Sequence, residues 1–115
     1  MALKISQTKN AFRCKVIISE PVDNGFEDQT VYVRFKIVPQ SRIDEVVRNE
    51  NDDDKDILDE VLTGWDESAF RDDAESPILF TPENKTLILD VPYVRTALIK
   101  AYFQALNGKD YKRKN

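Results

Sequence analysis

The sequence contains no histidine and only one cysteine, Cys14, among its 115 residues. Without histidine the chain lacks the commonest general base and the commonest metal ligand, which excludes Ser-His-Asp triads and histidine metal sites. A single cysteine cannot form an internal disulfide and is typical of a protein in a reducing compartment. These absences favour a binding or assembly protein over an enzyme.

Long apolar runs are also missing. No stretch approaches the roughly 20 apolar residues that a helix needs to cross a bilayer, and the first fifteen residues lack the apolar segment of a secretory signal peptide. We therefore expect a cytosolic protein with no membrane contact. The length predicts a single domain over residues 1–115.

Charge is distributed unevenly along the chain. Residues 1–43 carry seven Lys or Arg against four Asp or Glu, residues 44–90 carry four against sixteen, and residues 91–115 carry six against one. The net charges of the three segments are therefore +3, −12 and +5. An acidic segment between two basic ones can be neutralised within one molecule or between copies, and it argues against nucleic acid as a partner.

Apolar residues alternate with polar ones in two segments, which predicts two β-strands. The alternating residues are Phe12, Cys14, Val16 and Ile18 in the first segment and Val31, Val33, Phe35 and Ile37 in the second. Asn24-Gly25 lies between them and favours a two-residue turn, which would place Ile18 opposite Val31. Every apolar side chain would then face an apolar partner. We predict an antiparallel hairpin over about residues 12–38.

The other face of this hairpin carries four cations. The same register places Arg13 opposite Lys36 and Lys15 opposite Arg34. Like charges in facing positions are destabilising. Either the four side chains are simply solvated, or this basic face contacts an acidic surface. The acidic middle of the same chain, or of a second copy, is the obvious candidate for that surface.

The rest of the chain, about residues 41–107, shows helical periodicity. Ser41 is a candidate N-cap and Gly64 a candidate C-cap glycine for residues 42–63, which form either one kinked helix or two. The pattern of residues 65–80 predicts a loop that packs on the core through a few apolar side chains. The anchoring side chains would be Trp65, Phe70, Leu79 and Phe80.

Two further helix starts follow. Thr81 and Pro82 begin a short helix, and Asp90 caps a longer one that runs from about Val91 to Asn107. The predicted fold is α+β, with an N-terminal antiparallel hairpin, three to four helices and a basic tail at 108–115.

One acidic run invites comparison with a calcium site. Residues 51–56, NDDDKD, have the aspartate spacing of an EF-hand loop, but Ile57 stands where that loop needs glycine and Thr63 where it needs glutamate. The other carboxylates have no recognisable catalytic partner. We therefore expect no metal, no cofactor and no catalytic site.

The last helix has a broad apolar arc. Its members are Val94, Leu98, Ile99, Ala101, Tyr102, Phe103, Ala105 and Leu106. Either a small domain uses every apolar side chain for its core, or part of the arc binds another copy or a partner helix. On the second interpretation the partner-binding or oligomerisation residues are Trp65, Phe80, Val94, Leu98, Tyr102, Phe103, Arg13, Lys15, Arg34 and Lys36.

The C-terminal half carries a series of short motifs. They are VLTGW (Val61 to Trp65), an acidic loop, FTPEN (Phe80 to Asn84), LDVPYVRTALIKAYFQAL (Leu89 to Leu106) and the basic ending GKDYKRKN. In this order and spacing the chain resembles the tail assembly chaperones of long-tailed siphophages, in their short, non-frameshifted form. The genes for such chaperones lie between those of the tail tube and the tape measure protein.

The resemblance implies a function. Such a chaperone binds the tape measure protein, keeps it soluble and promotes polymerisation of the tail tube around it. It forms a homo-oligomer, as a ring or a spiral, in the host cytoplasm and is absent from the mature virion. A −1 frameshift often produces a longer form that recruits tail tube protein, and codons for Arg113-Lys114-Asn115 could form the slippery site.

Three alternatives remain open at this point. The first is a structural tail component that is retained in the virion. The second is an acidic inhibitor that mimics nucleic acid and binds a basic enzyme. The third is a small carboxylate-dependent enzyme, which would need a concave pocket and carboxyl groups with shifted pKa values.

Overall fold

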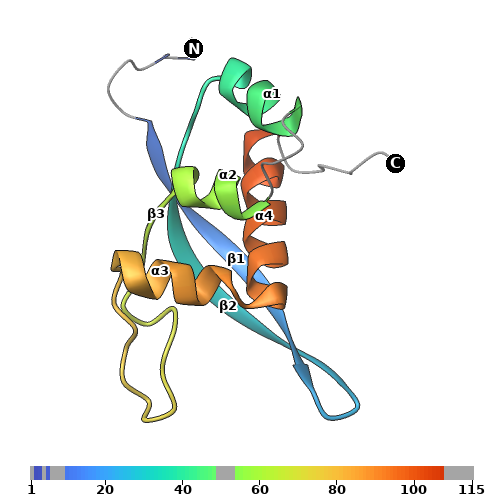
Figure 1. Cartoon of the computed structure of the whole chain (residues 1–115), viewed down its shortest axis with the longest axis vertical. Helices are drawn as coiled ribbons and strands as arrows, with labels where there is room; N and C mark the ends of the chain where they lie inside the picture. The colour runs from blue at the N-terminus through green and yellow to red at the C-terminus, as the bar shows by residue number, and fades with distance from the viewer. Residues whose placement is uncertain (1, 4, 6–9, 49–53, 108–115) are drawn as a thin grey trace.

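The computed structural model describes residues 2, 3, 5, 10–48 and 54–107. The predicted basic tail at 108–115, with Arg113-Lys114-Asn115, lies outside the described residues, as does the first half, 51–53, of the acidic run at 51–56. Within the described ranges the chain has the predicted α+β fold, a hairpin followed by helices (Figure 1). The elements are β1 (Ala11–Val22), β2 (Gly25–Lys36), α1 (Gln40–Arg48), α2 (Asp54–Val61), β3 (Leu62–Trp65), α3 (Pro82–Leu89) and α4 (Pro92–Leu106).

The predicted hairpin is present, but its register is shifted by two residues. Val22 pairs with Gly25, so the loop is Asp23-Asn24 and not Asn24-Gly25. The prediction placed positive φ at both Asn24 and Gly25, whereas Gly25 does not have it. Asn24 has a positive φ, of 67°, because asparagine tolerates the left-handed region better than other non-glycine residues.

The shift is an even number of residues, so each side chain stays on its predicted face of the sheet. Val16 faces Val31, and both are buried in the core. The expectation that every apolar residue meets an apolar partner fails at Ile18, which faces Gln29. Ile18 is nevertheless 4% exposed, because the packing of the inner face covers it.

A third strand replaces the end of the predicted helix over residues 42–63. Leu62–Trp65 forms β3, which pairs antiparallel with β2 and places Gly64 beside Arg34. The predicted C-cap role of Gly64 is therefore wrong. The apolar spacing continues from α2 into β3, and four residues are too few to show the alternation of a strand.

The helix boundaries confirm some of the predicted caps. The hydroxyl of Thr81 accepts a hydrogen bond of 3.1 Å from the backbone N–H of Asn84, as expected for an N-cap. Ser41 lies inside the first turn of α1, which begins at Gln40, and is not its cap. Asp90 is the C-cap of α3 rather than the N-cap of the following helix.

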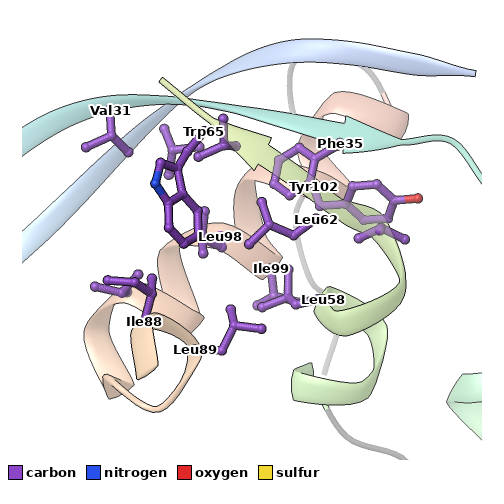
Figure 2. Close-up of a cluster of buried hydrophobic side chains, with 14 of the residues drawn as sticks. Val31, Phe35, Leu58, Leu62, Trp65, Ile88, Leu89, Leu98, Ile99 and Tyr102 are labelled. Carbon is purple, nitrogen blue, oxygen red and sulfur yellow. The ribbon is translucent and has the colours of Figure 1, made fainter. Parts of the chain in front are cut away.

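One hydrophobic core lies between the sheet and helices α2, α3 and α4 (Figure 2). The sheet order is β1-β2-β3, and its inner face supplies Phe35, which is 0% exposed. Helices α2 and α4 supply Leu58, Leu98 and Tyr102, each also 0% exposed. The Tyr102 hydroxyl donates a hydrogen bond of 3.0 Å to the carbonyl of Lys36, so its polar end is satisfied where the ring is buried.

Candidate interaction surfaces

The apolar arc of α4 belongs to the core. Val94, Leu98 and Tyr102 are 6%, 0% and 0% exposed, and Figure 2 shows Leu98 and Tyr102 within the buried cluster. A partner could contact these three side chains only if α4 separated from the sheet. Of the two interpretations of the arc, the structure therefore supports the core for these residues.

Phe103 lies at the edge of this arc. Its ring meets that of Tyr102 edge to face, with centroids 5.6 Å apart, and its side chain is half-buried. It therefore packs on the core from outside and presents only part of its ring to solvent. Phe103 adds little area to any partner surface.

Trp65 and Phe80 anchor the loop between β3 and α3. The Trp65 ring, 9% exposed, meets the rings of Phe70 and Phe80 edge to face at centroid distances of 5.0 and 4.8 Å. Its indole N–H donates a hydrogen bond of 2.7 Å to the carbonyl of Ile78. Leu79, also predicted as an anchor, is 54% exposed and is not among the side chains packed against the core.

The four predicted cations lie on the face of the sheet opposite the core. In the observed register Arg13 faces Arg34, Lys15 faces Tyr32, and Lys36 faces Ala11. Arg13 and Lys15 are exposed, as is Arg34, and Lys36 is half-buried. We call these four residues the basic face.

One cation of the basic face is paired within the molecule. The Arg13 guanidinium donates a hydrogen bond of 2.7 Å to the Asp66 carboxylate and lies 4.0 Å over the ring of Tyr32. This hydrogen bond raises the pKa of Arg13 and lowers that of Asp66, to which the positive charge of Arg34 also contributes. The expected contact between the basic face and the acidic middle of the same chain exists at this point.

The other three cations lack such a partner. Lys15, Arg34 and Lys36 form no ion pair with any residue that the structure describes. On the same face Ile17, an apolar side chain that is 54% exposed, follows Lys15 and faces Thr30, several residues from Arg34 and Lys36. The basic face is therefore an exposed surface of positive charge that an apolar side chain borders at one end.

The outer half of the hairpin forms a projecting arm. Each strand has twelve residues, but all of residues 21–30 are exposed, and Figure 1 shows this end extending beyond the helices. We call residues 19–30 the hairpin arm. Its apolar side chains Val22 and Phe26 are 43% and 75% exposed. In the first strand the apolar alternation stops at Ile18, before the arm begins.

The hairpin arm is also acidic. Its charged residues are Glu20, Asp23, Glu27 and Asp28. Glu20 directly faces Glu27 across the two strands, an arrangement that destabilises an isolated hairpin. The arm therefore combines negative charge with exposed apolar side chains.

A second projection is the acidic loop before α3. The Asp72 carboxylate accepts hydrogen bonds of 2.9 and 3.0 Å from the backbone N–H groups of Ala74 and Ser76, which fixes the turn. Glu75 has a positive φ of 65° in this turn. Asp73 is exposed at its tip.

Helix α3 adds a short exposed stripe on the side away from the core. Glu83, Leu87 and Asp90 follow one another at helical spacing, and all three are exposed, Leu87 by 60%. Buried Ile88 and Leu89 hold the other side of α3 against the core. We call this stripe the acidic side.

The described residues contain no group of three or more His, Cys, Asp or Glu side chains placed to hold a metal ion. Cys14 is half-buried, and its burial raises the pKa of the thiol, which lowers the reactive thiolate fraction. None of the described helices is long and apolar enough to cross a membrane. The features that the structure brings forward are surfaces suited to contact with other proteins.

Comparisons with protein families, curated proteins and solved structures find no match for the chain.

Proposed function

We propose that the chain is an assembly protein of the tail assembly chaperone type, which binds a tape measure protein and keeps it soluble until the tail tube polymerises around it. The name of the partner comes from the sequence resemblance. The observation that carries the binding role is the hairpin arm, with Phe26 three-quarters exposed at its end.

The hairpin arm is shaped for contact with another protein. Strands rise about 3.4 Å per residue, so the arm reaches roughly 20 Å beyond the core. A large aromatic side chain on such a projection adds nothing to the stability of its own domain, whereas aromatic anchors dominate binding energy at protein interfaces. Pro21 faces Phe26 across the arm and adds to the apolar surface.

The chemistry of the arm also indicates the kind of partner. Its carboxylates form no ion pair among the described residues, so a segment with basic and apolar side chains would complement it. A tape measure protein is long and helical, and an amphipathic helix that presents apolar side chains beside Lys and Arg offers this combination. We therefore infer that the hairpin arm, rather than the buried face of α4, binds the tape measure protein.

The remaining elements of the function follow from the resemblance. The chaperone acts in the host cytoplasm and is absent from the mature virion. A longer form made by a frameshift brings tail tube protein to the complex. Binding is the whole of the activity, with no catalytic step, metal or cofactor.

Co-expression with the tape measure protein tests this proposal. The tape measure protein is expected in the soluble fraction, with many copies of this chain bound, and in inclusion bodies when expressed alone. Mass spectrometry of purified virions is expected to detect tube and tape measure proteins without this chain. Its presence in virions at the level of a structural subunit would favour a retained tail component instead.

A further inference from the structure

β1 is an edge strand of the sheet. The strand order is β1-β2-β3, so β1 has a neighbouring strand on one side only. Its pairing with β2 runs from Ala11 to Val22 without a bulge, whereas the pairing of β2 with β3 is interrupted between Arg34 and Phe35. Proteins usually protect a long edge strand with bulges, prolines or a covering segment. The proline of β1, Pro21, lies in the hairpin arm, so the ten residues before it contain neither device.

Two hydrogen bonds show which backbone groups of β1 point away from β2. In an antiparallel pair, residues that bond the partner strand alternate with residues whose N–H and C=O groups point the other way. The Asn10 carbonyl accepts a hydrogen bond from the N–H of Ile37, the next pair in the register, so the even-numbered residues of β1 bond β2. Tyr32, which faces Lys15, agrees, because its carbonyl accepts a hydrogen bond of 3.0 Å from Asp66 on the β3 side. The odd-numbered residues of β1 therefore direct their backbone groups to the free edge.

The free edge is accessible next to the core. Outside the hairpin arm its outward-directed residues include Arg13, Lys15 and Ile17, and all three are exposed. Apart from the pairing with β2, no described residue forms a backbone hydrogen bond with them. On the core side of the same strand, Phe12 and Cys14 are half-buried, because they pack on the core from its margin. The edge therefore offers unpaired backbone groups beside a partly open apolar flank.

We propose that the free edge of β1 binds an extended segment of another protein, in which acidic and apolar residues alternate, and that this segment adds to the sheet as a further strand. Its backbone would bond the N–H and C=O groups of Arg13, Lys15 and Ile17, as in other cases of strand addition. Its acidic side chains would lie on the outer face of the sheet beside Lys15. Its apolar side chains would lie on the core side beside Phe12 and Cys14.

The charge of Lys15 favours an acidic partner. Lys15 forms no ion pair with any residue that the structure describes, and opposite charges on neighbouring strands are stabilising where like charges are destabilising. Two β1 strands paired around Lys15 would oppose like charges, which disfavours edge-to-edge pairing of two copies. The proposed site does not include the hairpin arm, and the proposal holds whether or not the chain binds a tape measure protein.

Amide hydrogen exchange of the free chain, followed by NMR, tests whether the edge is open. The N–H groups of Arg13, Lys15 and Ile17 should exchange fast, because they have no partner. Those of Cys14 and Val16 should exchange slowly, because they bond β2. Slow exchange at all five residues would mean that the edge is already covered, and would overturn the proposal.

A synthetic peptide of about ten residues, in which Glu and Val alternate, tests binding. It should shift the NMR signals of the three edge residues and slow the exchange of their amides. A peptide with Lys in place of Glu should bind at least about tenfold more weakly. A Glu-Val peptide methylated on its backbone nitrogens keeps its side chains but cannot donate to a strand, so it should not bind. Absence of binding by the unmodified peptide, equal binding by either control, or shifts confined to other elements would contradict strand addition.

Ile17→Pro tests the same edge from the side of the protein. The N–H of residue 17 points away from β2, so proline should remove an edge donor and leave the pairing with β2 intact. The variant should fold, as measured by circular dichroism, and bind the Glu-Val peptide at least about tenfold more weakly. Ile17→Thr is the matched control, because it keeps the N–H and the branched side chain, and it should bind like the wild type.

Lys15→Glu tests the charge preference and does not depend on whether Ile17→Pro folds. It should weaken binding of the Glu-Val peptide and strengthen binding of the peptide with Lys in place of Glu. Wild-type affinity of folded Lys15→Glu for both peptides would overturn the assignment of an acidic partner.

Discussion

The guanidinium of Arg13 donates a hydrogen bond of 2.7 Å to the carboxylate of Asp66, a residue 53 positions further along the chain. The contact joins the start of β1 to the residue that follows β3, across the ring of Tyr32. The backbone N–H of Asp66 also donates a hydrogen bond of 3.0 Å to the Tyr32 carbonyl. Opposite charges from the basic and acidic segments therefore meet where the sheet is completed.

The Arg13–Asp66 pair predicts a pH dependence. Because Arg13 lowers the pKa of Asp66 in the folded state, Arg13→Gln should raise this pKa towards the ordinary value of about 3.9. A depressed carboxyl pKa contributes stability above the unfolded-state pKa, and this contribution is lost as pH falls through the folded-state pKa. The melting temperatures of wild type and Arg13→Gln should therefore differ at neutral pH, begin to approach each other below about pH 3.9, and converge once the pH has fallen through the folded-state pKa of Asp66.

The measurement is an NMR titration of the Asp66 carboxyl carbon in both proteins. Lys15→Gln is the matched control, since it removes a cation of the same face that does not contact Asp66. An unchanged Asp66 pKa in Arg13→Gln would show that the hydrogen bond does not form in solution.

The burial of α4 predicts a large loss of stability from Leu98→Ala. Leu98 is 0% exposed at the centre of the core, so the variant should lose about 3 kcal/mol in the free energy of unfolding, through lost burial and the remaining cavity. Leu87→Ala, on the exposed side of α3, should change this free energy by less than about 0.5 kcal/mol. Urea denaturation measures both. A stable Leu98→Ala protein would mean that α4 does not pack on the sheet as described.

The position of Gly64 within β3 predicts that alanine is tolerated there. A Cβ at this residue would have Arg34 Cδ as its nearest neighbour, at an ordinary contact distance of 3.8 Å. Gly64→Ala should therefore change the free energy of unfolding by less than about 0.5 kcal/mol, and reduced unfolded-state freedom could offset any crowding. The same substitution at a left-handed C-cap glycine should cost about 1 kcal/mol. Urea denaturation distinguishes the strand from the cap.

The sequence predicted the parts of the fold that depend on local pattern. Alternation predicted the hairpin and its two faces, and Thr81 with Pro82 predicted the start of α3 because capping is a contact between close neighbours in the chain. The predicted hairpin register was wrong because a shift of two residues leaves every side chain on its predicted face, so the alternation does not distinguish the two registers.

The parts that escaped prediction depend on contacts between distant residues. β3 forms because Trp65 pairs with Val33 and the Trp65 ring packs against the loop that follows. Neither contact can be predicted from residues 62–65 alone. The apolar arc of α4 was consistent with either core or partner surface, since periodicity reports which side chains are apolar but not what covers them. The hairpin arm could have been recognised from the loss of alternation after Ile18.

We propose that the hairpin arm binds the tape measure protein, and Phe26→Ser tests this proposal most directly. Phe26 is 75% exposed, so the variant should fold and keep the oligomeric state of the wild type. Leu79→Ser is the control, because Leu79 is also more than half exposed but lies before α3, away from the arm.

The measurement is the amount of tape measure protein in the soluble fraction after co-expression with each variant. We expect wild type and Leu79→Ser to keep it soluble, and Phe26→Ser to reduce the soluble amount, because the loss of about 1.4 kcal/mol of binding free energy would raise Kd about tenfold. Equal solubility with Phe26→Ser and wild type would contradict the role of the arm.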